Sequence, residues 1–439
     1  MKLLNLSPAF PPLLRRYALI MAAMLVGSFV FTVFMTWLLH WPHPFGWVWI
    51  GGDLQWCDFH AFQQRSAHFR TPSYWMEYDY PMTYPAVVAV IFALFYKLPH
   101  PLKLYLTILI IAFLVYAVWL ARGLTKRGIP WDQALGFGLV VIFTAWPVFY
   151  QWDTANIEGL MGMILFCGII AVLRGWSWTG TSLLALAGAM KLFPAIMLAL
   201  LFSKRRYKEF AFGVVLMGII NYGSLAILGP SIGFAQGQIK DGFRFLRNNF
   251  ITPRWSLQMN FSHALYMPIK FIVLGIDRLI RYGGHHGPSR HEIAVVDTTL
   301  TIYMVVMAII GLTIYFWRIR KLPMLNQVIT LTVCALTFTP FSSDYTLNHM
   351  LLPLGLMCFY ATEAWRDNHV VPGLETCFAC CCIILGFTTF FTTYYAFGNT
   401  FRCIALITLL ITVMRFPFYW SPLDSIDRTG QDFAPTQES

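Results

Sequence analysis

The chain has 439 residues, of which 58% are hydrophobic, 17% aromatic and only 12% charged. An average globular domain carries about 25% charged residues, so the composition excludes an ordinary soluble protein. Long apolar stretches recur from end to end and predict an all-α, polytopic membrane protein. The net charge of +11 lies mainly in short loops and tails, where cytoplasmic retention and anionic lipids account for it, and no soluble basic domain is present to bind nucleic acid.

The apolar runs predict about twelve membrane spans, with a range of roughly eleven to thirteen. The first span follows Arg15 and Arg16 and is too long for the core of a signal peptide, so we expect it to remain as an anchor. One integral-membrane domain then covers residues 1–420, and residues 421–439 form a polar tail. The predicted spans are 17–39, 82–98, 102–121, 134–150, 157–173, 181–202, 209–228, 298–317, 325–341, 346–365, 371–394 and 400–420.

The basic loops predict the orientation of these spans. With the N-terminus inside, residues 204–208 and 318–321 also fall inside, and the loops 40–81 and 229–297 lie outside. The basic cluster at 122–127 then falls outside, against the rule. Within the second loop, 264–276 is apolar but short, and we expect an interfacial or re-entrant helix there.

The first external loop contains the stretch DFHAFQQRSAHFR, in which Asp58, Phe62, Arg65 and Phe69 share one helical face. This spacing predicts a short helix lying on the membrane, with its aromatic side chains directed into the interface. Asp58 at its start could take a proton from a hydroxyl group. It could equally cap the helix and satisfy free amide groups.

Lys191 lies near the middle of the predicted span 181–202, where an idle charge is costly. It could pair with a carboxylate such as Glu158, reach toward the interface, or bind an anion such as phosphate. Residues 152–160 read as the start of a helix. The predicted topology places them inside, which argues against a part in an external active site.

Two more external segments carry polar side chains. Residues 241–263 bring Arg254, Ser262 and His263 into an aromatic-rich loop, where arginine suits either phosphate or lipid headgroups. Residues 341–349 place Asp344 and His349 at an external helix end. His349 could bind phosphate or assist proton transfer, although a lone histidine is more often a structural hydrogen-bonding group.

The cysteines do not suggest a disulfide framework or a metal site, since most lie in apolar runs as small hydrophobic residues. No Walker loop, dinucleotide fingerprint, serine elbow or zinc helix is present. These absences argue against an ATP-driven pump and against an enzyme with a soluble nucleotide-sugar domain.

Several motifs in order resemble one known group. They are an aspartate soon after the first span, a DFxxF-type surface helix, the pair Tyr84-Pro85, the segment NIEGL and the helix motif G-x-x-K-L-x-P at 188–194. Together they resemble glycosyltransferase family 87, the DUF2029 group, which includes polyprenol-phosphate-mannose-dependent mannosyltransferases of GT-C fold. The chain departs from the family pattern at Ala86 and at 155–158.

The resemblance implies a GT-C-type glycosyltransferase fold with interfacial helices in the first external loop, and Asp58 as the catalytic base. It also implies an inverting transfer, with mannose as the expected sugar, from a polyprenyl-phosphate donor to a glycolipid or glycan acceptor, with no cofactor and no metal demanded. The expected donor-phosphate ligands are Arg65, Lys191, Arg254 and His349, and the expected substrate-binding residues are His60, Tyr84, Ser262, His263 and Asp344.

The expected location is a bacterial inner membrane, with the active site facing the non-cytoplasmic side. A transporter or lipid flippase remains an alternative, because it would also place a charge such as Lys191 in the membrane. A noncatalytic membrane scaffold is a third reading, and it leaves the polar external residues unexplained.

Overall fold

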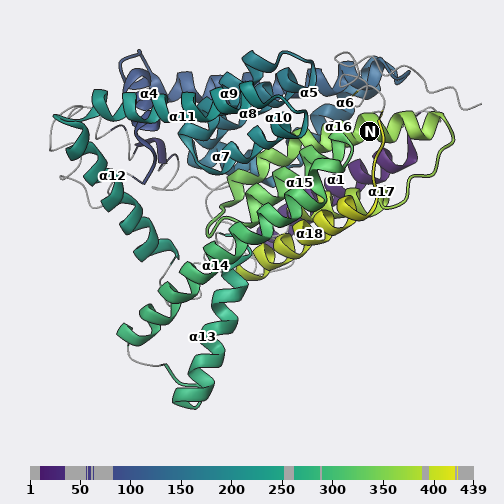
Figure 1. Ribbon diagram of the computed structural model, residues 1–439. Coiled ribbons are helices and arrows are strands. Elements are labelled where there is room, and N and C mark those ends of the chain that lie inside the picture. Colours follow the sequence, from purple (N-terminus) through teal and green to yellow (C-terminus); the bar gives the residue numbers. More distant parts are fainter. Residues whose placement is uncertain are drawn as a thin grey trace, which may run out of the picture.

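The structure is a computed structural model that describes residues 10–34, 56, 58–60, 63, 83–251, 262–286, 289–387, 395–420 and 423. Every regular element in these ranges is a helix (Figure 1). This confirms the all-α class. The tail at 421–439 and most of the first external loop lie outside the described residues.

The helices follow one another closely along the described chain. They are α1 (Pro12–Val33), α4 (Ala86–Tyr96), α5 (Pro101–Thr125), α6 (Trp131–Phe143), α7 (Trp146–Thr154), α8 (Glu158–Leu173), α9 (Ser177–Met190), η3 (Phe193–Leu198), α10 (Ala199–Ser203), α11 (Tyr207–Leu228), α12 (Ile232–Leu246), η4 (Arg247–Ile251), α13 (Tyr266–Tyr282), α14 (Ser289–Trp317), η6 (Ile319–Lys321), α15 (Met324–Thr337), η7 (Asp344–Met350), α16 (Leu351–Arg366), α17 (Leu374–Leu385) and α18 (Tyr395–Arg415).

Five described helical segments are long and apolar enough to cross a membrane: α1, α5, α11, α14 continued into η6, and α18. The pair α6 and α7, bent by 56°, adds a sixth if it is one span. Shorter apolar helices lie among them, namely α4, α8, η3 with α10, α15 and α17. The chain is therefore a membrane protein, but helix length alone does not give the predicted twelve spans.

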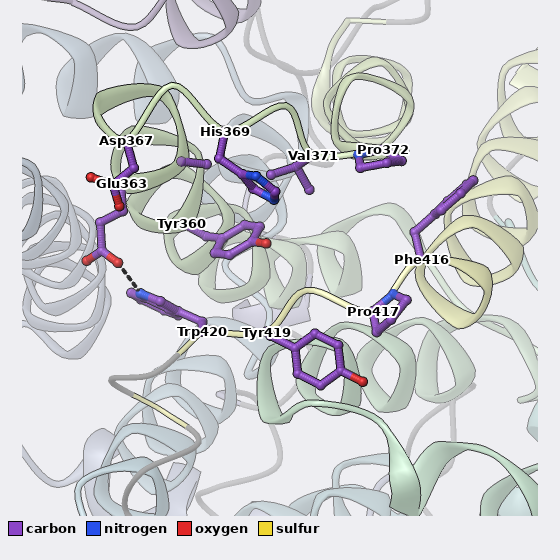
Figure 2. Close-up of a pocket in the computed structure, with 11 residues that line it drawn as sticks. Tyr360, Glu363, Asp367, His369, Val371, Pro372, Phe416, Pro417, Tyr419 and Trp420 are labelled. Carbon is purple, nitrogen blue, oxygen red and sulfur yellow. Dashed lines mark hydrogen bonds between the residues drawn. The ribbon is translucent and has the colours of Figure 1, made fainter.

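The helix ends that carry the basic loops lie together, and we term this the basic end of the bundle. Four contacts join these ends: Arg16 with Glu375, Arg127 with Glu363, Arg206 with the hydroxyl of Ser177, and Arg318 with the carbonyl of Met414. Figure 2 shows a pocket at this end, where the Nε1 group of Trp420 donates to Glu363. The same Glu363 forms an ion pair with Arg127, just beyond the end of α5.

The predicted span 82–98 is wrong as a membrane crossing. The helix there, α4, has only 11 residues. Near its start the hydroxyl of Tyr84 accepts from Asn156, and at its end the hydroxyl of Tyr96 donates to the carbonyl of Phe59. Because Phe59 and Asn156 both lie beside Asp58, α4 begins and ends at the end of the bundle opposite the basic end.

The predicted span 181–202 is wrong as well, because the chain reverses within it. Helix α9 ends at Met190, and Lys191 has an extended backbone with φ −156° and ψ 139°. The chain then returns through η3 and α10, and Arg206 beyond α10 contacts Ser177 at the start of α9. One predicted span is therefore two antiparallel segments.

The first correction removes one crossing and the second adds one, so α11 and the helices after it keep the orientation that was predicted for them. The two corrections also remove the conflict over the basic cluster 122–127, because α5 starts beside Asn156, to which Tyr105 donates, and ends with Arg127 paired to Glu363. The cluster lies at the basic end with the other basic loops, as the positive-inside rule expects.

Helices α13 and α14 form a hairpin that projects from the body of the bundle (Figure 1). A small separate core, which includes Tyr266, Leu274 and Tyr303, holds the two helices together. Nearer the tip, Arg278 makes two hydrogen bonds to the buried carboxylate of Glu292. Helix α13 includes most of residues 264–276, the segment expected to form an interfacial or re-entrant helix. The side chains of Phe271 and Ile280 on this helix are exposed.

Candidate active site

Asp58 is held in place by its neighbour in sequence. Residues 58–60 are helical, and the ring of Phe59 is fully buried against α4 and α5. It packs on Phe92, Tyr96 and Tyr105 at centroid distances of 5.1–5.9 Å. This anchoring leaves Asp58 half-buried at the end of the bundle opposite the basic end.

Asn156 connects Asp58 to the bundle. Its side-chain amide donates to Asp58 Oδ2 at 2.7 Å and to the hydroxyl of Tyr84 at 2.8 Å. The turn between α7 and α8 presents this side chain, and Ala155 adopts a left-handed backbone with φ 48° to make it. The end of α7 contacts the chain beside Asp58 as well, since the Trp56 amide donates a hydrogen bond to the Asp153 carbonyl at 2.7 Å.

Glu158 lies two residues further on and is 1% exposed. Its Oε1 atom pairs with Lys191, and its Oε2 atom lies 3.3 Å from Nε2 of His349. The Lys191 ammonium also faces aromatic rings, of which Phe193 is at 5.4 Å and Tyr345 at 5.5 Å. Two potential cations therefore share one buried carboxylate. Of the alternatives open for Lys191 from the sequence, pairing with Glu158 is the one that the structure shows.

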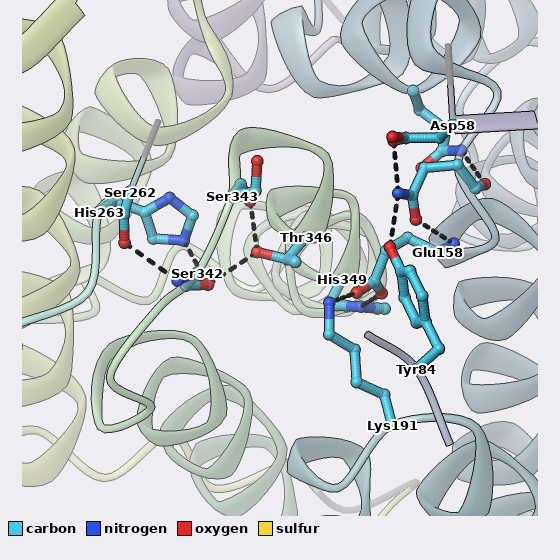
Figure 3. Close-up of polar contacts among 12 residues, drawn as sticks. Asp58, Tyr84, Glu158, Lys191, Ser262, His263, Ser342, Ser343, Thr346 and His349 are labelled. Carbon is cyan, nitrogen blue, oxygen red and sulfur yellow. Dashed lines mark hydrogen bonds and ion pairs between the residues drawn. The ribbon is translucent and has the colours of Figure 1, made fainter. Parts of the chain in front are cut away.

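These six residues, Asp58, Tyr84, Asn156, Glu158, Lys191 and His349, are here termed the Asp58 network (Figure 3). Burial and the charges of Asp58 and Glu158 raise the pKa of the Tyr84 hydroxyl above its usual range. Tyr84 therefore stays neutral at physiological pH. The side chain of Lys191 is 29% exposed, so its ammonium keeps access to a ligand.

A second group, the tie cluster, comprises Ser262, His263, Ser342, Asp344 and Arg402. Ser262 accepts from the amide of Ser342 at 3.0 Å, and Nε2 of His263 lies 3.0 Å from the Ser342 hydroxyl. Asp344 accepts from Arg402 and lies 3.8 Å from Nδ1 of His263. It also accepts from the indole of Trp146 at 2.8 Å.

Burial alone would raise the pKa of Asp344, but Arg402 and the bonds from its other neighbours hold that pKa at about 2. Burial lowers the pKa of His263, only partly offset by Asp344. The tie cluster therefore contains a carboxylate–guanidinium pair and a neutral histidine at physiological pH. It joins α7, η7 and α18 to the segment that precedes α13.

The structure divides the predicted site residues into three sets. The Asp58 network includes Asp58, Tyr84, Lys191 and His349, whereas the tie cluster includes Ser262, His263 and Asp344. His60 is exposed and contacts Gln63 at 3.3 Å. Arg65 and Arg254 lie outside the described residues, as do Phe62 and Phe69 of the predicted helical face.

The predicted topology put residues 152–160 at the wrong end of the bundle relative to Asp58, since Asn156 contacts Asp58 directly. The error followed from counting α4 as a crossing. Lys191 lies at the C-terminal end of α9 and not in the middle of one continuous helix. Arg402 was not among the predicted site residues, although an arginine inside an apolar predicted span is a signal for a buried partner.

Among the described residues, no group of three or more His, Cys, Asp or Glu side chains has an arrangement suited to a metal ion. All but one of the described cysteines are buried free thiols, and Cys167 is exposed, in keeping with their expected packing role.

The sequence model of glycosyltransferase family 87 matches residues 82–343, which is more than half of the chain. The chain belongs to glycosyltransferase family 87. Membership of family 87 makes the protein a membrane glycosyltransferase. The family match includes Tyr84, Asn156, Glu158 and Lys191, whereas Asp58 and His349 lie beyond its limits. No curated protein and no solved structure matches the chain.

Proposed function

We propose that this protein is an inverting, GT-C-type glycosyltransferase that moves mannose from a polyprenyl-phosphate donor to a glycolipid or glycan acceptor. The observation that carries the proposal is the Asp58 network. It places a half-buried carboxylate and two potential cations at one end of a membrane bundle. The proposed location is the bacterial inner membrane, with this end on the non-cytoplasmic side.

In the proposed reaction Asp58 acts as general base on the acceptor hydroxyl. The acceptor oxygen bonds to the anomeric carbon while the bond from that carbon to the donor phosphate oxygen breaks. The hydroxyl proton passes to Asp58, and the bonding electron pair leaves with the polyprenyl phosphate. Attack opposite the leaving group inverts the anomeric configuration.

The leaving phosphate gains negative charge during this step, and fixed cations are the groups that stabilise such charge best. Lys191 and His349 meet at Glu158 in the same network as Asp58, and Lys191 is partly exposed. We assign both to the donor phosphate. Arg65 and Arg254 remain proposed phosphate ligands, and His60 and Tyr84 remain proposed contributors to substrate binding. Ser262, His263 and Asp344 were expected to bind substrate as well, but because the tie cluster buries them, we propose instead that they hold the elements around the site together.

The depth of the site favours a lipid-linked donor. Helix α9 has 14 residues between the basic end and Lys191, and α8 has 16 from Glu158. At 1.5 Å per residue these helices span about 21 and 24 Å, less than the roughly 30 Å hydrocarbon core of a bilayer. The Asp58 network therefore lies below the outer membrane surface, within reach of a phosphate carried on a membrane lipid.

Although α8, α9 and η3 with α10 stop short of the outer membrane surface, we also propose that twelve segments run through the membrane between the two ends of the bundle. They are α1, α5, α6, α8, α9, η3 with α10, α11, α14, α15, α16, α17 and α18. Both termini then lie inside with the basic end, and α4, α7, α12 and α13 belong to the external side. This sorting follows the positive-inside rule at residues 122–127 as well.

A transporter or flippase is the alternative. Such a protein places its binding groups near the bilayer midplane, where two halves of the fold meet. Here the buried charged groups Glu158, Asp344 and Arg402 gather at the end opposite the basic loops. This favours an enzyme working at one face.

The test is transfer of radiolabel by the purified full-length protein in detergent or nanodiscs. Polyprenyl-phosphate-mannose is offered with extracted membrane lipids, and glucosyl and arabinosyl lipid donors are offered in parallel. We expect labelled lipid from one of these donors, with mannose preferred. Transfer from a soluble nucleotide sugar in the absence of any lipid-linked donor would overturn the proposed donor class.

A further inference from the structure

Asn156 lies in the turn between α7 and α8 and is 1% exposed. Its backbone is fixed independently of its side chain. The hydroxyl of Tyr105 and the side-chain amide of Gln151 both donate to its carbonyl oxygen. The backbone of Asn156 is therefore held in place, which limits the positions that its side chain can take.

The orientation of the Asn156 amide is determined by its partners. Its Oδ1 atom accepts from the backbone amide of Glu158 at 2.9 Å. A backbone N–H can only donate, so the oxygen must face Glu158 and the nitrogen must face Asp58. The two N–H groups of that nitrogen are directed to Asp58 Oδ2 and to the hydroxyl of Tyr84.

Asp58 and Asn156 come from segments 98 positions apart, and a second contact fixes them to one another. The Trp56 amide donates to the carbonyl of Asp153, in the last turn of α7 just before Asn156. The carboxylate and the amide that donates to it are thus carried on one connected frame. An N–H donated to a carboxylate favours its ionised form.

We propose that Asn156 is a positioning residue for Asp58, orienting its carboxylate toward the acceptor hydroxyl and keeping it ionised. This inference rests on the proposed role of Asp58 as base. It gives the α7–α8 turn a function in the reaction, beyond its place in the fold. Tyr84, the second acceptor of the same amide, restrains the Asn156 side chain from the opposite direction.

The test is a pH–rate profile of Asn156→Ala in the transfer assay, with melting temperature measured alongside. Loss of one hydrogen bond to a charged group predicts a fall in kcat of about tenfold to hundredfold. The KM for the lipid donor should change little. The acidic limb of the profile should move to higher pH, because Asp58 loses a donor that favours its charged form.

Two further variants keep the test decisive. Asn156→Asp preserves the size of the side chain and sets a like charge against Asp58, so the acidic limb should move further in the same direction. Tyr84→Phe removes the other acceptor and keeps the Asp58 bond, so its acidic limb should stay at the wild-type pH whatever its rate.

The outcomes separate this inference from the proposed function. An active Asp58→Asn protein would overturn the role of Asp58 itself. If Asp58→Asn is inactive while Asn156→Ala and Asn156→Asp keep the wild-type kcat and acidic limb, only the role of Asn156 is overturned.

Discussion

The Asp58 network and the tie cluster both lie in the part of the bundle away from the basic end and use the same kinds of side chain, yet they differ in exposure. In the tie cluster His263, Asp344 and Arg402 are 0%, 4% and 2% exposed. In the Asp58 network Asp58 is half-buried and the Lys191 side chain is 29% exposed. A closed group of charges can hold elements together, whereas a partly open one can also meet a ligand.

We expect the largest effect on activity from a substitution of Asp58, the proposed base in the partly exposed Asp58 network. Asp58→Asn keeps an acceptor oxygen and a similar size but removes the base. We expect the transfer rate to fall by about 10²- to 10⁴-fold, with the melting temperature close to that of the wild type. A large fall in melting temperature together with the loss of activity would instead show that Asp58 stabilises the fold.

The tie cluster should show the opposite pattern. Asp344→Asn leaves the Arg402 guanidinium buried without its counter-charge, and breaking such a pair typically costs about 3–5 kcal/mol of unfolding free energy. Thermal unfolding in a fixed detergent should therefore shift strongly. The surviving folded protein should keep substantial transfer activity, and complete loss of activity without destabilisation would show that Asp344 serves the substrate directly.

A substitution at Lys191 tests whether one residue can both stabilise the fold and bind the donor phosphate. Lys191→Met leaves Glu158 buried beside His349 alone, and partial exposure of the lysine reduces the expected cost to about 1–3 kcal/mol. Adding Glu158→Gln removes the unpaired charge and should restore much of the stability. Activity should remain low in the double variant, because the phosphate has lost a cation; recovery of both would exclude a role in donor binding.

The smallest effect concerns pH. Burial lowers the pKa of His263 below its value of about 6.5 in unfolded chains. The unfolded state therefore binds a proton first as pH falls, so stability declines below about pH 6.5, by at most about 1.4 kcal/mol per pH unit. Asp344, with a pKa of about 2, stays ionised throughout this window. Melting curves at pH 5 and 7 should differ less for His263→Gln than for the wild type.

Apolar composition and periodicity predicted the all-α class and the membrane character of the chain, because those features depend on local sequence. The two wrong spans show the limit of that information. The run at 82–98 has the composition of a span, but the contacts of Tyr84 and Tyr96 with distant residues keep α4 at one end. The run at 181–202 is apolar on both sides of Lys191, and its reversal accompanies pairing with Glu158.

Only those residues of the candidate site that are unusual in their local sequence could be predicted. Asp58, Lys191 and His349 could be recognised singly, because an ionisable group in an apolar surrounding is unusual. Asn156 could not, since an asparagine before a helix has an ordinary local explanation. Its role follows from a contact between residues that are distant in sequence and that the wrong assignment of 82–98 as a span had placed at opposite ends.

The most direct test of the central claim is the rate of the chemical step in Asp58→Asn with the lipid donor already bound. Donor-saturated protein is mixed with acceptor, and product is followed over a single turnover beside a measurement of donor affinity. We predict a chemical step at least about 100-fold slower than in the wild type, with unchanged donor affinity. A chemical step at the wild-type rate would contradict the assignment of Asp58 as the base.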